Sequence, residues 1–278
     1  MDHIFKNNNT DKVKSVVLYI VIGLLVAFPL FTNLDALTIR LWDEARNACN
    51  AVEMSLSGNY IVSTYDYAPD MWNTKPPFLI WTQVFFIKVL GFGNGELAVR
   101  LPSAIGAFLT CLAVFLLCIK YVKNKVLAIS AVLVLVTIER YVDLHGTRTG
   151  DFDALLTLFT TASLISFFCF MEKKDKRFLY LFFISLALGA LTKSIVALLI
   201  LPAVGIYTIS QKQTINLLKN KHFYFGILVF VIPVISFYLL RDHYNPGYIK
   251  AVQENELGGR YLSTIEGHKE NFWFYYYN

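Results

Sequence analysis

Two charged motifs stand in the long segment that follows the first apolar run of the chain. Asp43 and Glu44 come shortly after that run, and Lys75 precedes two consecutive prolines. A carboxylate can accept a proton from an attacking group, and a cation held by a stiff turn can bind a phosphate. The motifs therefore predict chemistry on a charged lipid headgroup, with Asp43 and Glu44 as candidate catalytic residues. The structural alternative is that these acids begin a helix over 44–56 and complement its dipole.

Lys193 is a further candidate, because it lies between two apolar stretches and has no acid within a dozen residues on either side. An ionisable group in such a setting is a functional candidate, and a lysine that extends its ammonium to the membrane surface is the alternative. Asp153 precedes the apolar run 154–171 and either acts in the site or caps that helix. The remaining candidates of this region are Arg100 and Asp151, as possible substrate-binding residues, and Arg148. Both arginines have an alternative role as anchors at the membrane interface.

The composition predicts a multi-pass, all-α integral membrane protein. Hydrophobic residues make up 56% of the 278 residues, charged residues 16%, and the mean hydropathy is +0.51. A soluble domain of this length is less apolar. Three of the four cysteines fall in apolar runs, and Cys49 has no partner outside them, which argues against a disulfide framework or a cysteine metal site. We expect membrane lipids as partners, and no nucleic acid, metal or cofactor.

The charges of the segments that connect the apolar runs predict a membrane topology. The segments fall at about 15–32, 78–90, 101–121, 126–142, 154–171, 178–192, 194–210 and 222–240. Four of the connecting segments are rich in lysine and arginine: 1–14, 120–125, 171–177 and 211–221. They hold 13 of the 25 basic residues and only four of the 20 acids. Basic loops stay on the cytoplasmic side, so we expect these four to share it.

This placement has two consequences for the helices. Segment 78–90 must lie in the interface without crossing, and 178–210 must be a hairpin that turns at Lys193. About seven spans result, in a single domain over 1–278. The first loop, 33–100, carries interfacial helices and lies on the extracytoplasmic side together with 241–278. The aromatic end of the sequence resembles the entry to another helix, so we expect the chain to be truncated at its C-terminus.

Six motifs, in order, resemble those of the polyprenyl-phosphate-sugar-dependent GT-C glycosyltransferases. They are Asp-Glu-Ala-Arg-Asn-Ala (43–48), Ser-Gly-Asn-Tyr-Ile-Val (57–62), Lys-Pro-Pro-Phe-Leu-Ile-Trp (75–81), Arg-Leu-Pro-Ser-Ala (100–104), Asp-Ala-Leu-Leu-Thr-Leu-Phe (153–159) and Leu-Thr-Lys-Ser (191–194). The branch with the aminoarabinose transferases of lipid A and the protein O-mannosyltransferases is the most similar. A tail with Arg260 and His268 also resembles that branch and adds two candidates for substrate binding.

The resemblance implies a role for each candidate. Asp43 corresponds to the catalytic acid of the first loop and Asp153 to the second acidic position. Lys75 and Lys193 correspond to cations near the donor phosphate, and Arg148 is a third candidate for that phosphate. The sequence departs from the family at Thr74, where relatives of the aminoarabinose type often have Glu, which weakens any metal site there.

The implied function is an inverting transferase of a bacterial cytoplasmic membrane. It would move a sugar from an undecaprenyl- or dolichyl-type phosphate to a lipid, glycan or protein acceptor at the extracytoplasmic face. The alternative is a non-enzymatic membrane protein: a transporter or flippase of lipid-linked sugars, or a scaffold subunit. Transporters are expected to show internal repeats and polar groups at mid-membrane, whereas the polar groups here collect at one face.

Overall fold

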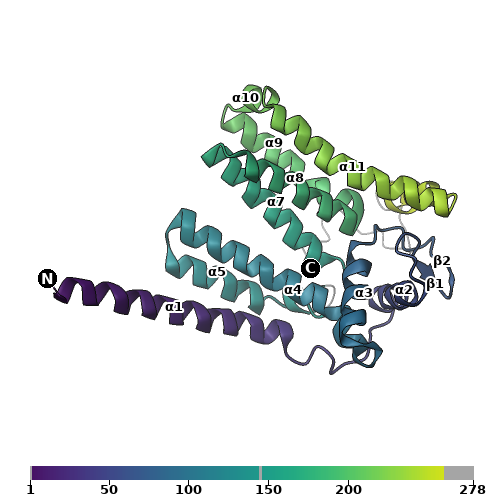
Figure 1. Ribbon diagram of the computed structural model, residues 1–278, viewed down its shortest axis with the longest axis horizontal. Coiled ribbons are helices and arrows are strands. Elements are labelled where there is room, and N and C mark those ends of the chain that lie inside the picture. The colour runs from purple at the N-terminus through teal and green to yellow at the C-terminus, as the bar shows by residue number, and fades with distance from the viewer. Residues whose placement is uncertain (1, 144–145, 260–278) are drawn as a thin grey trace, which may run out of the picture.

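The computed structural model describes residues 2–143 and 146–259, and almost all of its regular structure is helical (Figure 1). The first half contains α1 (Asp2–Phe31), α2 (Asp43–Ser57), β1 (Thr64–Tyr65), β2 (Ala68–Pro69), α3 (Phe78–Leu90), η1 (Phe92–Asn94), α4 (Gly95–Leu117), η2 (Cys118–Val122), α5 (Lys125–Thr137) and α6 (Glu139–Val142). The second half contains α7 (Asp153–Lys173), α8 (Lys176–Lys193), η3 (Ser194–Ile200), α9 (Leu201–Ser210), α10 (Thr214–Leu218), α11 (Lys221–Tyr244), α12 (Tyr248–Val252) and η4 (Gln253–Gly259). The all-α membrane fold is confirmed.

Five helical segments in the described residues are long and apolar enough to cross a membrane: Val13–Phe31, Phe92–Val122, Asp153–Lys173, Lys176–Ser210 and Lys221–Tyr244. The fourth of these segments is a hairpin. A Cβ added to Gly189 would lie 3.1 Å from the Cβ of Ala197, which shows that the chain reverses direction between these two residues. A continuous helix would separate these residues by about 12 Å. Each arm of the resulting hairpin is roughly 27–29 Å long, close to the hydrocarbon thickness of a bilayer.

The hairpin therefore turns at Lys193 and Ser194, where Ser194 adopts a left-handed φ of 50°. The helix α5, with 13 residues, is only about 20 Å long and short for a complete span. The total of seven spans remains a prediction.

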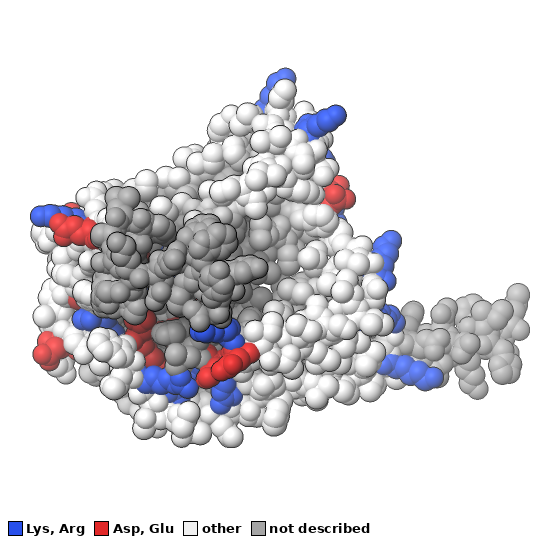
Figure 2. Space-filling view, turned by 180° about the vertical axis from the view of Figure 1, so that it is seen from behind, with Lys and Arg blue, Asp and Glu red and all other residues white. Residues whose placement is uncertain are grey.

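The two ends of the bundle differ in charge (Figure 2). Turns rich in lysine join α4 to α5, α7 to α8, and α9 to α11 at one end. Asn124, Asp175 and Asn220 cap the helices that begin there, each accepting a hydrogen bond from a backbone N–H of the following turn. We call this the basic end. The opposite end carries α2, the β1–β2 hairpin, α3 and α12, with acidic and basic residues mixed.

The predicted first loop folds into a cap on that opposite end. The helix expected over 44–56 is observed as α2, and α3 covers the expected segment 78–90. Met54 of α2, Ile80 and Val84 of α3 and Ala98 of α4 pack in one buried cluster. This packing joins the cap to the bundle; the interfacial depth of α3 remains a prediction.

Candidate active site

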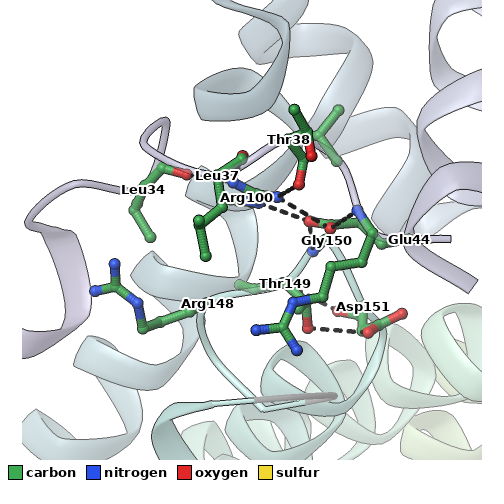
Figure 3. Close-up of polar contacts among 12 residues, drawn as sticks. Leu34, Leu37, Thr38, Glu44, Arg100, Arg148, Thr149, Gly150 and Asp151 are labelled. Atoms are coloured by element: carbon green, nitrogen blue, oxygen red, sulfur yellow. Dashed lines mark hydrogen bonds and ion pairs between the residues drawn. The ribbon is translucent and has the colours of Figure 1, made fainter.

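A buried ion pair between Glu44 and Arg100 lies at the centre of the cap (Figure 3). Arg100 Nε donates to Glu44 Oε1 at 2.7 Å and its Nη2 donates to Oε2 at 3.1 Å. The side chains are 1% and 3% exposed. Two parallel bonds of this kind fit the planar guanidinium to the carboxylate.

The remaining polar atoms of the pair are also used. Arg100 donates to the backbone oxygens of Leu34, Leu37 and Thr38, at 2.6–2.9 Å. Glu44 accepts from the backbone N–H groups of Arg40 (2.8 Å) and Gly150 (2.9 Å). The pair therefore joins the irregular segment after α1, the start of α2, α4 and the segment before α7.

These bonds decide the charge of Glu44. Burial alone would raise the pKa of Glu44, but the hydrogen bonds from Arg100, Arg40 and Gly150 outweigh it and lower the pKa below its ordinary value. A carboxylate with four donors and a lowered pKa is a poor general base. The geometry favours a positioning role for Glu44 over the predicted catalytic one, and likewise for Arg100 over substrate binding.

Asp43, the neighbouring candidate, has a different environment. It is the first residue of α2 and is exposed, and no hydrogen bond or ion pair joins it to another residue in the described part of the chain. Arg100 and Glu44 fix the helix that carries it. An accessible carboxylate on a fixed backbone remains available to a ligand.

The segment 147–152 passes under α2 and brings the next candidates to the site. Gly150 accepts hydrogen bonds at its backbone oxygen from Asn47 (3.1 Å) and Gln83 (3.2 Å). A Cβ at Gly150 would lie 2.4 Å from a methyl of Val99, so only glycine fits. Asp151 is buried and accepts a bond from Thr149 Oγ1 at 2.9 Å. Its burial favours a structural role over the predicted substrate binding.

Arg148 binds the end of the first long helix. Its Nη1 donates to the backbone oxygen of Pro29 at 2.8 Å and its Nη2 donates to that of Asn33 at 3.1 Å. Both contacts hold the turn after α1. The structure thus places this arginine in an anchoring position, and its predicted contact with the donor phosphate has no support from the geometry.

Lys193 and Asp153 pair at the mouth of the hairpin, and Lys75 lies against Phe152, the residue that precedes Asp153. Lys193 Nζ donates to Asp153 Oδ1 in an ion pair whose side chains are 22% and 41% exposed. Lys75 Nζ lies 5.2 Å from the centre of the Phe152 ring, next to Asp153. The sequence shows no acid near Lys193 because its partner is 40 residues away. The ion pair thus joins the end of α8 to the start of α7, and Lys75 contacts the residue just before α7.

Residues that sequence reasoning missed hold Lys75 in place. Tyr248 Oη donates to the backbone oxygen of Thr74 at 2.8 Å, and Thr74 Oγ1 donates to Glu256 at 3.1 Å. Arg241, 2% exposed, donates to the backbone oxygens of Ser63 and Asp70 and lies over the Tyr248 ring. The one available signal was Arg241, a charge near the end of a long apolar run.

Asp70 is another buried carboxylate that the sequence did not single out. It accepts hydrogen bonds from Arg46 Nε (3.0 Å), Asn50 Nδ2 (3.0 Å) and the backbone N–H groups of Trp72 and Asn73. Burial would raise its pKa, but these bonds lower it below the ordinary value. The network fixes the turn that leads to Lys75.

The other predicted candidates can be placed only in part. Arg260 and His268 lie outside the described residues. Within residues 2–143 and 146–259, no three His, Cys, Asp or Glu side chains gather as a metal site would require. The predicted absence of a metal is not tested by this finding.

The central ion pair gives a stability prediction. Arg100→Met should lower the free energy of unfolding by about 3–5 kcal/mol, because Glu44 would remain buried without its partner. The double variant Arg100→Met/Glu44→Gln should lose less than the sum of the two single losses. Chemical unfolding in detergent measures these values. Arg40→Gln is the control, because its ion pair with Asp143 is exposed.

The same pair predicts a pH dependence. The folded-state pKa of Glu44 is lowered, so its contribution is complete above the ordinary value of about 4.5 and is lost as the pH falls through the folded-state pKa. Glu44→Gln should lack this part of the acid destabilisation. For the stability prediction above, an equal loss of unfolding free energy in Arg100→Met and Arg40→Gln would show that the pair does not stabilise the cap.

Comparison with known proteins agrees with this architecture. Residues 74–239 match the family described as dolichyl-phosphate-mannose-protein mannosyltransferase. An undecaprenyl phosphate-alpha-4-amino-4-deoxy-L-arabinose arabinosyl transferase of Wigglesworthia glossinidia brevipalpis is 26% identical over 98% of this chain and 47% of its own length. A second such enzyme, from Proteus mirabilis, is 31% identical over 76% of this chain and 37% of its own length.

A solved structure has the same fold. The crystal structure of ArnT from Cupriavidus metallidurans bound to undecaprenyl phosphate superimposes with a TM-score of 0.73 at 19% identity, covering 95% of this chain and 47% of that protein. The chain thus spans about half the length of the relatives it matches. The family match covers more than half of the chain and includes Lys75, Arg100, Asp153 and Lys193. On these grounds, and in agreement with the motifs, the chain belongs to the dolichyl-phosphate-mannose-protein mannosyltransferase family.

Proposed function

We propose that this chain forms the donor-binding half of a membrane glycosyltransferase that takes a sugar from a polyprenyl phosphate. The observation that carries the proposal is the Lys193–Asp153 ion pair at the end of the bundle opposite the basic end, with Lys75 on the neighbouring Phe152. Similar enzymes are named for undecaprenyl-phosphate-linked aminoarabinose, and ArnT was solved with undecaprenyl phosphate, which supports this donor class.

The proposed reaction is a single displacement with inversion at the sugar. The acceptor oxygen attacks the anomeric carbon, the bond from that carbon to the phosphate oxygen breaks, and the polyprenyl phosphate leaves with the electron pair. Negative charge therefore grows on the phosphate, and fixed cations stabilise it in a partly dehydrated site. Lys75 and Lys193 supply those cations. Asp43 accepts the proton of an acceptor hydroxyl.

Asp153 positions Lys193 in this scheme. Its carboxylate holds the ammonium at the mouth of the hairpin before the donor arrives. With the donor bound, Lys193 contacts both Asp153 and the phosphate. The pair restricts the long side chain of Lys193, which lowers the entropy lost on donor binding.

The family assignment favours a transferase over the transporter or scaffold alternative. We propose that the site faces the extracytoplasmic side of a bacterial cytoplasmic membrane, because the lysine-rich turns gather at the opposite end of the bundle. The acceptor is proposed to be a lipid, glycan or protein with an accessible hydroxyl.

The role of Asp43 is tested by a substitution that keeps its size. Asp43→Asn should lower turnover by roughly 10²–10⁴-fold with a hydroxyl acceptor, because the base is lost. Asp35→Asn is the matched control, since Asp35 is an exposed acid of the same loop. The measurement is sugar transfer by the full-length enzyme in membranes. A well-folded Asp43→Asn enzyme with the turnover of Asp35→Asn would exclude Asp43 as the base.

The donor cations are tested by binding of undecaprenyl phosphate to the purified protein. Lys193→Ala should weaken binding by about 10–100-fold, the range for a lost charge-assisted contact, and Lys193→Arg should retain part of it. Lys75→Ala should act similarly, and the double variant should lose less than the sum of the two effects in free energy. Lys250→Ala, at an exposed site with an exposed partner, is the control. Unchanged affinity of Lys193→Ala would show that Lys193 does not bind the phosphate.

A further inference from the structure

A polar pocket lies at the basic end of the bundle, remote from the Lys193 hairpin turn. It has a volume of about 120 Å³ and is bordered by Lys174, Gln213, Asn216 and Asn220, with apolar side chains of α7 and α10 beneath. Among the residues that the structure describes, Lys174 is the one charged residue that borders it. The acids Glu172 and Asp175 belong to the same turn but do not border the pocket.

Two of the three amide groups of this pocket have their oxygens engaged within the protein. Asn220 Oδ1 already accepts from the backbone N–H of His222, and Gln213 Oε1 accepts from Asn216 Nδ2. The groups of Asn220 and Gln213 that remain for a ligand are therefore N–H donors. An ammonium and two amide donors without a carboxylate suit a phosphate group.

An apolar groove of about 450 Å³ continues from the same place into the bundle. It runs between α7, α8, α9, α10 and α11, and Leu217 of α10 borders both the groove and the polar pocket. Aromatic and aliphatic side chains such as Phe182, Val204 and Phe230 form most of its wall. Gly205 leaves an opening in it, because a Cβ there would have no atom within 4 Å.

We propose that the polar pocket and the groove together bind one anionic glycerophospholipid of the surrounding membrane. The phosphate lies at Lys174 and the amides of α10, and an acyl chain lies in the groove. The membrane is the source because most residues that line the groove belong to helices long and apolar enough to span it. Basic pockets between spanning helices at the cytoplasmic side suit such headgroups.

Charge at this end supports an anionic lipid over a neutral one. Lys173, Lys176, Arg177, Lys212, Lys219 and Lys221 surround the turns that border the pocket. Their field attracts an anionic headgroup, and Lys174 fixes its position. The site is separate from the proposed donor site and does not depend on the transferase reaction.

The test compares lipids of different headgroup on the purified full chain in detergent. Addition of phosphatidylglycerol should raise the thermal midpoint by roughly 2–4 °C, and phosphatidylcholine should raise it less. Native mass spectrometry should retain one phosphatidylglycerol per chain. Salt at 1 M should reduce the difference between the midpoint shifts that the two lipids cause, because the electrostatic screening length is then about 3 Å.

Two variants separate the contribution of the headgroup pocket from that of the groove for the acyl chain. Lys174→Gln should remove the preference for phosphatidylglycerol but keep the response to both lipids. Gly205→Phe should fill the groove and remove both responses. The controls are Lys123→Gln, because Lys123 also ends a helix of this end with a left-handed φ of 56°, and Gly23→Phe, because Gly23 borders a different apolar pocket. The midpoint of each variant without lipid reports its folding.

Three results would overturn the proposal. Equal responses of the unsubstituted chain to the two lipids would exclude a headgroup site. An equal loss of preference in Lys123→Gln and Lys174→Gln would show diffuse surface attraction. A normal response of Gly205→Phe would show that the groove is not occupied by lipid, as expected if protein covers it.

Discussion

The buried ion pair of Glu44 and Arg100 fixes the geometry of the whole cap. Removing two charges from water costs several kcal/mol for each ion, and the pair is stable only because every remaining donor and acceptor finds a partner. Those partners lie in the irregular segment after α1, which includes Arg40, and at Gly150. Four separate segments are therefore held together by one pair, and loss of either partner leaves a buried charge.

The proposed reaction depends on this ion pair indirectly, through the backbone that the pair holds in place. The pair holds the start of α2, which presents Asp43 to solvent, and it also holds Gly150, three residues before Asp153. Lys193 reaches Asp153 from the hairpin turn, and Lys75 is held from the other side by Tyr248 and Glu256 through Thr74. Each proposed reacting group is thus carried by backbone that other buried polar groups position.

Much of this architecture follows from the sequence. Hydropathy predicted the long helices, the excess of lysine predicted which turns share one end, and the requirement that those turns share one side predicted the hairpin at Lys193. The motifs predicted the family. The helix expected over 44–56, from the acids at its start, and the apolar segment 78–90 are observed as α2 and α3.

The pairings were not predictable, since they join residues that are distant in sequence. Glu44 and Arg100 are 56 residues apart, so both looked like free candidates for chemistry. Asp153 pairs with Lys193 across 40 residues, and Arg148 meets the end of α1 across more than 100. Tyr248 and Glu256 act on backbone and hydroxyl groups, and no motif marks such contacts. Single-sequence patterns report local periodicity and composition, whereas these bonds depend on how whole helices pack.

The most direct test of the account is the structure of the full-length protein with a bound polyprenyl phosphate, determined in a lipid bilayer disc. The account predicts the phosphate within hydrogen-bonding distance of Lys75 and Lys193, with the Glu44–Arg100 pair intact and Asp43 facing the acceptor side of the sugar position. A phosphate bound at the basic end, or one that contacts Arg100 after the pair with Glu44 has opened, would contradict it.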